Sequence, residues 1–326
     1  MKKGELEKIF SSFNKKKVLI VGDSMIDAYM WGSINRQSPE ASVPVVDIDQ
    51  HEIRLGGAAN CALNIKSLGA EPILCSVIGN DKNGIQFSQL MEESNLSNLG
   101  IVISDKRKTT VKTRVISEGK HQIRIDEEDT HPIEIENKFL NNVLKLLADI
   151  NVIILQDYNK GVLSKKIIRE LISESKNRNI PIIVDPKKDN FLEYRDCDIF
   201  KPNLVEIKHG MGMEFNEHIN DELENVTTKL KQKLNAKAIL LTLSSEGICS
   251  SSSEGFIKVP AFGGKVVDVS GAGDTVISVA SLLLTEGVSF ENITKISCLS
   301  GGIVCQEVGV VSIDREKLLS EAVLII

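Results

Sequence analysis

The sequence predicts an α/β protein with a central, mostly parallel sheet, and three observations support this fold class. Short runs rich in β-branched residues alternate with segments of helical periodicity, which is the pattern of β–α–β crossover units. Several of these runs end in polar residues. Hydrophobic residues make up 42% of the 326-residue chain, enough for one large core. We therefore expect a single domain over residues 1–326.

The expected strands of the sheet follow one another at crossover spacing, after a short amphipathic helix at the N-terminus. They are residues 17–23, 71–78, 152–156, 180–185, 199–202 and 238–243. Ligands of open α/β sheets bind beyond the carboxyl ends of the strands, so polar side chains at those ends are candidates for a site. The residues in these places are Asp23, Asp157, Asp185, Asn203 and Thr242.

Two stretches, residues 33–54 and 109–127, break the alternation of strands and helices. Both carry apolar residues at every second position, which is typical of strands with one buried face. We expect them to pair as antiparallel strands outside the main sheet, as insertions into the domain. A serine run at residues 250–253 fits the tip of a hairpin.

Residues 266–279 carry the clearest chemical signal, because they read as a strand, a glycine-rich turn and a helix whose serines face outward. Gly271 and Gly273 lack a Cβ, so the backbone can approach a ligand, and the helix that follows presents unpaired N–H groups. Asp274 can accept a proton from an attacking hydroxyl. Phosphoryl transfer needs both features. The alternative is an ordinary turn in which Asp274 caps the helix.

A second glycine cluster, Gly56 and Gly57, opens a predicted helix over residues 58–68 that Gly69 suits as a C-terminal cap. Asn60 lies in the first turn of this helix. An amide both donates and accepts hydrogen bonds, as recognition of sugar hydroxyls requires. The alternative is tight packing of a helix on a strand, for which glycine is equally suited.

Together the two clusters resemble the two signatures of the ribokinase-like (PfkB-type) carbohydrate kinases, at residues 56–69 and 268–275, and the resemblance covers essentially the whole chain. Residues 21–27, 36–46 and 157–161 resemble the branch that phosphorylates D-glycero-β-D-manno-heptose 7-phosphate. The resemblance implies a three-layer αβα ribokinase-like fold with a small β lid. It also implies phosphoryl transfer from ATP to the anomeric 1-hydroxyl, which gives the 1,7-bisphosphate.

The resemblance assigns Asp274 the role of catalytic base, with backbone N–H groups of Gly271, Ala272 and Gly273 stabilising the developing charge. ATP and Mg²⁺ are the implied cofactors, and a monovalent cation is a further candidate. Asn203 and Glu206 match a motif that holds Mg²⁺ through water, which suits a hard cation that prefers oxygen ligands. The alternative for Glu206 is a solvated helix residue.

The nucleotide-binding candidates combine the glycine turn with a segment that resembles the family's Thr-x-Gly-x-x-Gly, in which a serine replaces the first glycine. They are Asn203, Thr242, Ser244, Gly247, Gly271 and Gly273. The candidates for the sugar are Asp23, Asp27, Gly56, Gly57 and Asn60. Asp23 could instead cap a turn.

A sugar phosphate also needs cations, and an arginine fork matches the geometry of phosphate. The candidates follow strand ends or lie in the two inserted stretches, and each could equally be a solvated surface charge. They are Arg36, Arg114, Arg124, Lys160 and Lys187. In the family the inserted strands cover the sugar and often form a dimer interface, so a homodimer is expected.

Composition excludes several other classes of function. The net charge is −6 with no long basic run, which argues against nucleic acid as a partner. No run of about 18 apolar residues exists, and the N-terminus carries charges where a secretory signal would be apolar, so we expect a cytoplasmic protein with no membrane span. The six cysteines lack Cys-x-x-Cys spacing and are expected to be reduced core residues, and the five histidines show no metal signature.

Two other functions stay open at this stage. A kinase of the same family that acts on a ribose-like, fructose-phosphate or nucleoside substrate would share the ATP site and differ in the lid. A non-catalytic sugar-binding protein would have a damaged base or glycine turn, and both are intact. Because the chain ends soon after the kinase signature, we expect a separate nucleotidyltransferase to act on the product.

Overall fold

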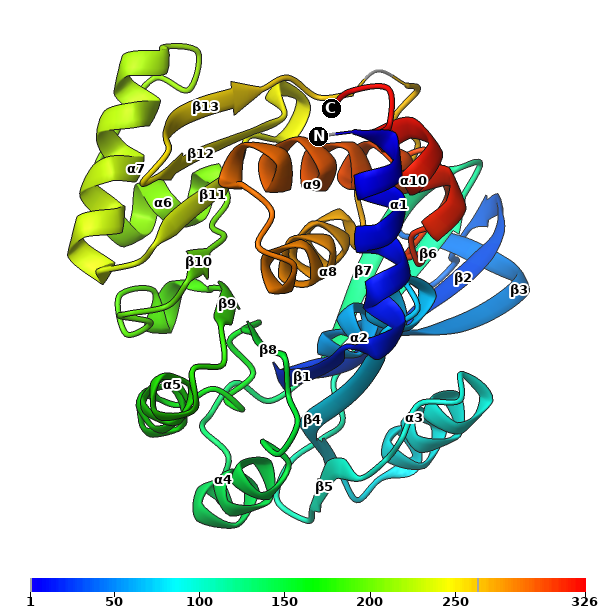
Figure 1. Ribbon diagram of the computed structural model, residues 1–326. Coiled ribbons are helices and arrows are strands. Elements are labelled where there is room, and N and C mark those ends of the chain that lie inside the picture. Colours follow the sequence, from blue (N-terminus) through cyan, green and yellow to red (C-terminus); the bar gives the residue numbers. More distant parts are fainter. Residues whose placement is uncertain (1, 263) are drawn as a thin grey trace.

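The computed structural model describes residues 2–262 and 264–326, and it forms a three-layer α/β fold (Figure 1). Within these residues, nine strands form the central sheet in the order β13-β12-β11-β10-β9-β8-β1-β4-β5, parallel except at β12 and β13. The strands are β1 Lys17–Gly22, β4 Glu71–Gly79, β5 Gly100–Ser104, β8 Val152–Gln156, β9 Ile182–Asp185, β10 Ile199–Phe200, β11 Ala238–Thr242, β12 Ile248–Ser252 and β13 Gly255–Val259. The predicted fold class is confirmed.

Helices cover both faces of the central sheet (Figure 1). Along β1, Ile20 packs in the core with α1, α2, α8, α9 and α10, whereas its neighbour Leu19 packs in a second core with α4, α5, α6 and α7. This alternation is why buried parallel strands are apolar throughout. The helices are α1 Lys3–Ser12, α2 Ala58–Ser67, α3 Lys82–Glu93, α4 Glu136–Lys145, α5 Lys165–Arg178, α6 Leu204–Met211, α7 Asn220–Leu234, α8 Ala272–Thr285, α9 Phe290–Val304 and α10 Arg315–Ala322. No helix within the described residues combines the length and apolar character of a membrane span.

A second sheet, which we call the lid, lies to one side of the central sheet (Figure 1). Its strands, in spatial order, are β3 Pro44–Gly57, β2 Ser24–Gln37, β6 Val111–Ser117 and β7 Lys120–Glu127. The prediction placed lid strands here but started the first insertion at residue 33. The structure corrects this, because β2 begins two residues after β1 ends and β3 runs directly into α2. Strands β2 and β6 pair in parallel, so the lid is not wholly antiparallel.

Three local predictions are wrong. Residues 266–269 are not a strand, and their valines are exposed. Ser278 and Ser281 do not face outward, because α8 packs between α2 and α9 and both side chains are buried; their hydroxyls donate to backbone carbonyls one turn earlier. Residues 250–252 form β12, with the hairpin tip beyond them. The strand β5 was not predicted. The six cysteines are free and five are buried, as expected.

Strands β1 and β8 pack closely at their carboxyl ends, and this contact bounds the region beyond those ends. Gly22 pairs with Gln156, and a Cβ on Gly22 would lie 1.9 Å from the Gln156 carbonyl oxygen. A glycine is therefore required at this position for the two strand ends to approach.

We predict that Gly22→Ala lowers the free energy of unfolding by about 1–3 kcal/mol, because backbone must move to admit the methyl group. Denaturant unfolding measures this. The matched control is Gly4→Ala in α1, where an added Cβ meets no atom within 4 Å and alanine should stabilise the helix by up to ~1 kcal/mol. Equal stabilities of the two variants would contradict the prediction.

Candidate active site

The Asp274 carboxylate lies in the first turn of α8, is 3% exposed, and accepts three hydrogen bonds. The Asn60 amide donates to Oδ2 at 2.8 Å. The Gln156 amide and the Tyr158 hydroxyl donate to Oδ1, at 3.0 and 2.7 Å. The site thus joins α8, the start of α2, the end of β8 and the loop after β8. The two glycine clusters that the sequence singled out meet here.

The glycines make this meeting possible. Gly271 precedes α8 with φ +79°, and a Cβ there would lie 2.8 Å from the Asn60 amide nitrogen. Gly57 precedes α2 with φ +61° and approaches the Asp23 carbonyl oxygen in the same way. Both φ values lie in the region that favours glycine. A side chain at Gly271 would also displace the amide that donates to Asp274.

Burial raises the pKa of Asp274 to about 7, because desolvation disfavours the charged carboxylate. The hydrogen bonds from Asn60 and Tyr158 oppose this shift, the nearby Asp185 charge adds to it, and Lys201 opposes it. A carboxylate that titrates near neutral pH is suited to general-base catalysis.

A second buried carboxylate, Asp185, lies at the end of β9 and accepts from two donors. Neither donor was predicted from the sequence to be a site residue. Lys201 forms an ion pair with Asp185 Oδ2 at 2.9 Å, and Gln156 also donates to this oxygen at 3.0 Å. Burial opposes ionisation, yet Lys201 and Lys187 keep the pKa of Asp185 below its usual value. The Lys201 amine lies 3.4 Å from where a Cβ on Gly273 would be, so a cation adjoins the glycine turn.

A cleft of about 610 Å³ opens beside this turn. Five of the six nucleotide-binding candidates line it; they are Asn203, Thr242, Ser244, Gly247 and Gly273. Gly271 instead packs against Asn60 and Val310. The exposed valines of residues 266–269 contribute Val266 and Val269 to an apolar wall. Lysines at one end and apolar walls elsewhere suit a ligand with phosphates and a flat ring.

Ser244, which replaces a glycine of the family pattern, has φ +54°. This left-handed conformation is costly for a residue with a Cβ, by about 1–2 kcal/mol. Ser244 therefore adopts the backbone conformation that a glycine at this position would favour.

Asn203 and Glu206 cap α6 reciprocally. The Asn203 side chain accepts from the Glu206 backbone N–H, and Glu206 Oε2 accepts from the Asn203 N–H, each at 2.9 Å. The other Glu206 oxygen pairs with Lys187, and Glu206 is 8% exposed, so it is not a solvated helix residue.

These residues fit a hydrated divalent cation. Both Glu206 oxygens accept from protein donors, which leaves contact through water as their route to a metal. Close by, Asp185 Oδ1 is buried and has no hydrogen-bond partner within the described residues, although the Lys187 amine lies 3.9 Å away, so it can still accept from a metal-bound water.

The structure gives Asp23 a role other than the predicted contact with sugar. Its two carboxylate oxygens accept the backbone N–H groups of Tyr158, Lys160 and Val162, at 2.8–3.0 Å. Asp23 is 1% exposed. It therefore anchors the loop after β8, in line with the alternative that it caps a turn.

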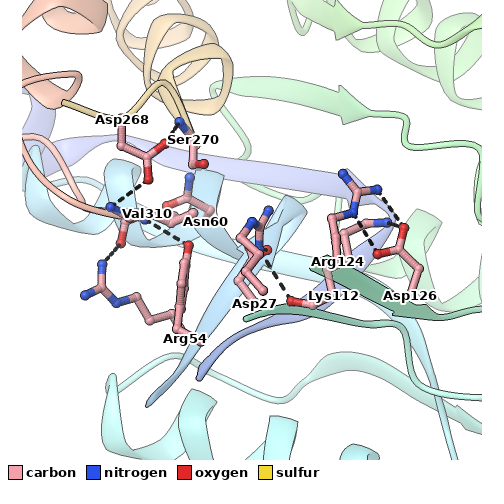
Figure 2. A network of polar contacts seen from close by, with 12 residues as sticks. Asp27, Arg54, Asn60, Lys112, Arg124, Asp126, Asp268, Ser270 and Val310 are labelled. Carbon is pink, nitrogen blue, oxygen red and sulfur yellow. Dashed lines mark hydrogen bonds and ion pairs between the residues drawn. The ribbon is translucent and has the colours of Figure 1, made fainter. Parts of the chain in front are cut away.

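Asp27 of β2 lies opposite Arg54 of β3, and its carboxylate covers the neighbouring Gly56, where a Cβ would collide with it. Arg114 pairs with Asp27 at 2.5 Å. Neighbouring lid charges are paired as well: Arg124 forms two bonds with Asp126, and Lys112 bridges Asp126 and Glu128, as Figure 2 shows in part. We call Lys112, Arg114, Arg124, Lys160, Asp27, Asp126 and Glu128 the lid charge cluster; Lys160 joins it through Glu128 at 2.7 Å.

Arg36 does not join this cluster. It is exposed near the outer end of β2, nine residues from Asp27 and so about 30 Å away along the strand. The remaining candidate, Lys187, lies over the Tyr158 ring and pairs with Glu206, at the boundary between the cleft and Asp274. Lys112, which is largely buried, was missed because nothing in its local sequence marks it.

A buried carboxylate beside a glycine turn, with lysines lining the adjoining cleft, is the arrangement that phosphoryl transfer requires on a three-layer α/β fold. The model of the pfkB family of carbohydrate kinases matches residues 15–317. The chain therefore belongs to the pfkB family and is a sugar kinase, which implies use of ATP with a metal such as Mg²⁺.

Relatives in sequence include proteins named bifunctional protein HldE. The one from Campylobacter curvus is 36% identical over 296 residues, which are 90% of this chain and 62% of the relative. The one from Geotalea uraniireducens is 33% identical over 324 residues, 98% of this chain and 66% of the relative. The chain thus spans less than two thirds of the length of these relatives.

Solved structures show the same fold at lower identity. Phosphofructokinase-2 from Escherichia coli in complex with potassium superposes with a TM-score of 0.79 and 18% identity, covering 94% of this chain and 99% of that one. Arabidopsis thaliana ribokinase complexed with ribose and ATP superposes with a TM-score of 0.73 and 17% identity, covering 94% of this chain and 98% of that one. The predicted ribokinase-like fold is confirmed.

We predict that kcat/KM for the sugar, at saturating ATP and Mg²⁺, falls about tenfold for each pH unit below about 7, because protonated Asp274 cannot accept a proton. Above pH 7 the rate should level off. The substrate phosphate is titrated separately by phosphorus NMR as a control. An acid limb near pH 4, the ordinary value for a carboxyl group, would contradict the assignment of the base.

Proposed function

We propose that this sugar kinase transfers the γ-phosphoryl group of ATP to the anomeric 1-hydroxyl of D-glycero-β-D-manno-heptose 7-phosphate and forms the 1,7-bisphosphate. The observation that carries the proposal is the similarity to HldE proteins over 90–98% of this chain, together with the resemblance of residues 36–46 to the heptose branch. The lid charge cluster supports it, because its four cations exceed its three carboxylates (4 − 3 = +1) and an excess of cations favours a second phosphate.

In this proposal Asp274 accepts the proton of the attacking hydroxyl. General-base assistance of this kind contributes about 10²–10⁴-fold to the rate. The backbone N–H group of Gly273 at the start of α8, with the nearby Lys201 amine, stabilises charge on the transferred group. The Ala272 N–H, predicted to share this role, instead donates to the Val269 carbonyl. A bound Mg²⁺, held through water by Asn203 and Glu206, would neutralise charge on the phosphates of ATP.

The test is ATP- and Mg²⁺-dependent turnover of the heptose 7-phosphate beside fructose 6-phosphate and ribose. We expect selective formation of the 1,7-bisphosphate, and a loss of about 10²–10⁴-fold in Asp274→Asn. The exposed Asp149→Asn is the matched control and should retain full activity. Turnover of another sugar alone would keep the kinase and reject the heptose substrate.

The lid also supports the expected homodimer. The edge strand β7 is exposed along its whole length, and Ile123 and Ile125 are 57% and 48% exposed on it. An exposed apolar edge strand favours pairing with another strand. Residues 36–46 lie at the outer end of the lid, where β2 ends and β3 begins, so contact with a second copy would bring them toward a sugar site.

We predict that Ile125→Asp converts a dimer into a monomer in analytical ultracentrifugation, because it places a charge in the proposed interface. The control is Leu324→Asp, an 82%-exposed site near the C-terminus and away from the lid, which should leave the mass unchanged. A wild-type chain that sediments as a monomer at every concentration would reject this role of the lid.

A further inference from the structure

The Tyr158 hydroxyl occupies the position that an acceptor hydroxyl needs. It lies 2.7 Å from Asp274 Oδ1 and donates to it. A hydroxyl that gives its proton to a general base must lie within about 2.6–3.2 Å of it. Asp274 is 3% exposed, and its Oδ1 already accepts from Gln156 and Tyr158, so a substrate hydroxyl takes a place at Oδ1 only if one of these two donors leaves.

Two of the three donors are fixed in the core. Asn60 and Gln156 are fully buried, the first in the first turn of α2 and the second at the end of β8. Asn60 is further held by Asn64, which donates to both its backbone and its side-chain oxygen. Neither amide can move without disturbing a helix or a central strand.

Tyr158 differs from them because its side chain is partly exposed and lines the cleft. Its backbone is held by Asp23, so the side chain and not the loop is the movable part. One face of the ring carries the Lys187 amine, 5.3 Å from the ring centre. A cation at this distance holds the ring only weakly at a partly exposed site, so this contact does not prevent rotation toward the cleft.

We propose that Tyr158 is a positioning residue that holds Asp274 in the free enzyme and is displaced by the acceptor hydroxyl, which takes over the same hydrogen bond. The proposal rests on Asp274 being the base. It has a second consequence: until the sugar arrives, Tyr158 keeps water from the position beside Asp274. Without it, water could attack the γ-phosphoryl group, give its proton to Asp274 and leave ADP and inorganic phosphate.

The first test compares wild type with Tyr158→Phe in calorimetric binding without ATP. The ligands are the heptose 7-phosphate and its 1,5-anhydro analogue, which lacks the anomeric hydroxyl. If the substrate panel selects another sugar, the pair is that sugar and its analogue without the phosphorylated hydroxyl. We expect Tyr158→Phe to bind the sugar roughly 10–100-fold more tightly, since no charged hydrogen bond is broken, and to bind the analogue as wild type does.

The second test is kinetic and needs no sugar assignment. Tyr158→Phe should hydrolyse ATP faster than wild type in the absence of sugar, and with sugar it should show a lower KM with kcat within a few-fold. Tyr194→Phe is the matched control, because its hydroxyl is bonded to Asp157 at 2.6 Å and not to Asp274. Tyr194→Phe should bind both the sugar and the analogue as wild type does. It should hydrolyse ATP in the absence of sugar no faster than wild type.

Weaker binding of both ligands to Tyr158→Phe, or a fall in kcat with unchanged hydrolysis, would overturn the proposal and make Tyr158 a permanent contact. Activity retained in Asp274→Asn would instead reject the proposed base. The two failures are therefore distinguishable.

Discussion

The structure of the site depends on one constraint: the Asp274 carboxylate is buried and must be satisfied from within the protein. Burying an ionised group without partners costs far more than any single packing contact gains. Asn60, Gln156 and Tyr158 meet this need from three separate segments. These hydrogen bonds fix α8 relative to the start of α2, the end of β8 and the loop after β8. A glycine is needed at position 271 because the Asn60 amide occupies the place that a Cβ would take.

The same constraint extends to the second carboxylate. Gln156 donates to both Asp274 and Asp185, so the two negative charges share one amide, and Lys201, the residue after β10, compensates the second charge. An arrangement of this kind couples neighbouring strand ends electrostatically. Lys187 and Lys201, which line the cleft, are held in place by ion pairs with carboxylates.

The lid is connected to the glycine turn through residues 308–310. Arg54 of β3 donates to the carbonyls of residues 308 and 310, and the Val310 N–H donates to the Tyr29 hydroxyl of β2. Asp268, just before the turn, accepts from Gly309 and Ser270, so both sides meet at one short segment (Figure 2). These contacts form a continuous path of hydrogen bonds from the lid to the segment before α8.

Sequence reasoning found what depends on local backbone chemistry and missed what depends on neighbouring strands. The glycine turn with Asp274 was predictable, because φ and helix-terminus requirements are local. Gln156 and Lys201 were not, because their roles follow from the order of β8, β9 and β10. The rule that polar strand ends face a ligand selected Asp23 correctly by place, but it cannot separate a ligand contact from an anchor for a loop. The prediction that the serines of α8 face outward was wrong for a related reason. Because α8 packs between α2 and α9, these side chains are buried although they are polar.

The two demands on Asp274 conflict, and the conflict explains the chemistry of its surroundings. A base that works near neutral pH needs burial, which raises its pKa to about 7. A base that meets its substrate needs an accessible oxygen. Rigid donors alone would satisfy the first demand and defeat the second. Two rigid amides with one donor on a partly exposed side chain satisfy both, because only the third hydrogen bond must be exchanged when substrate binds.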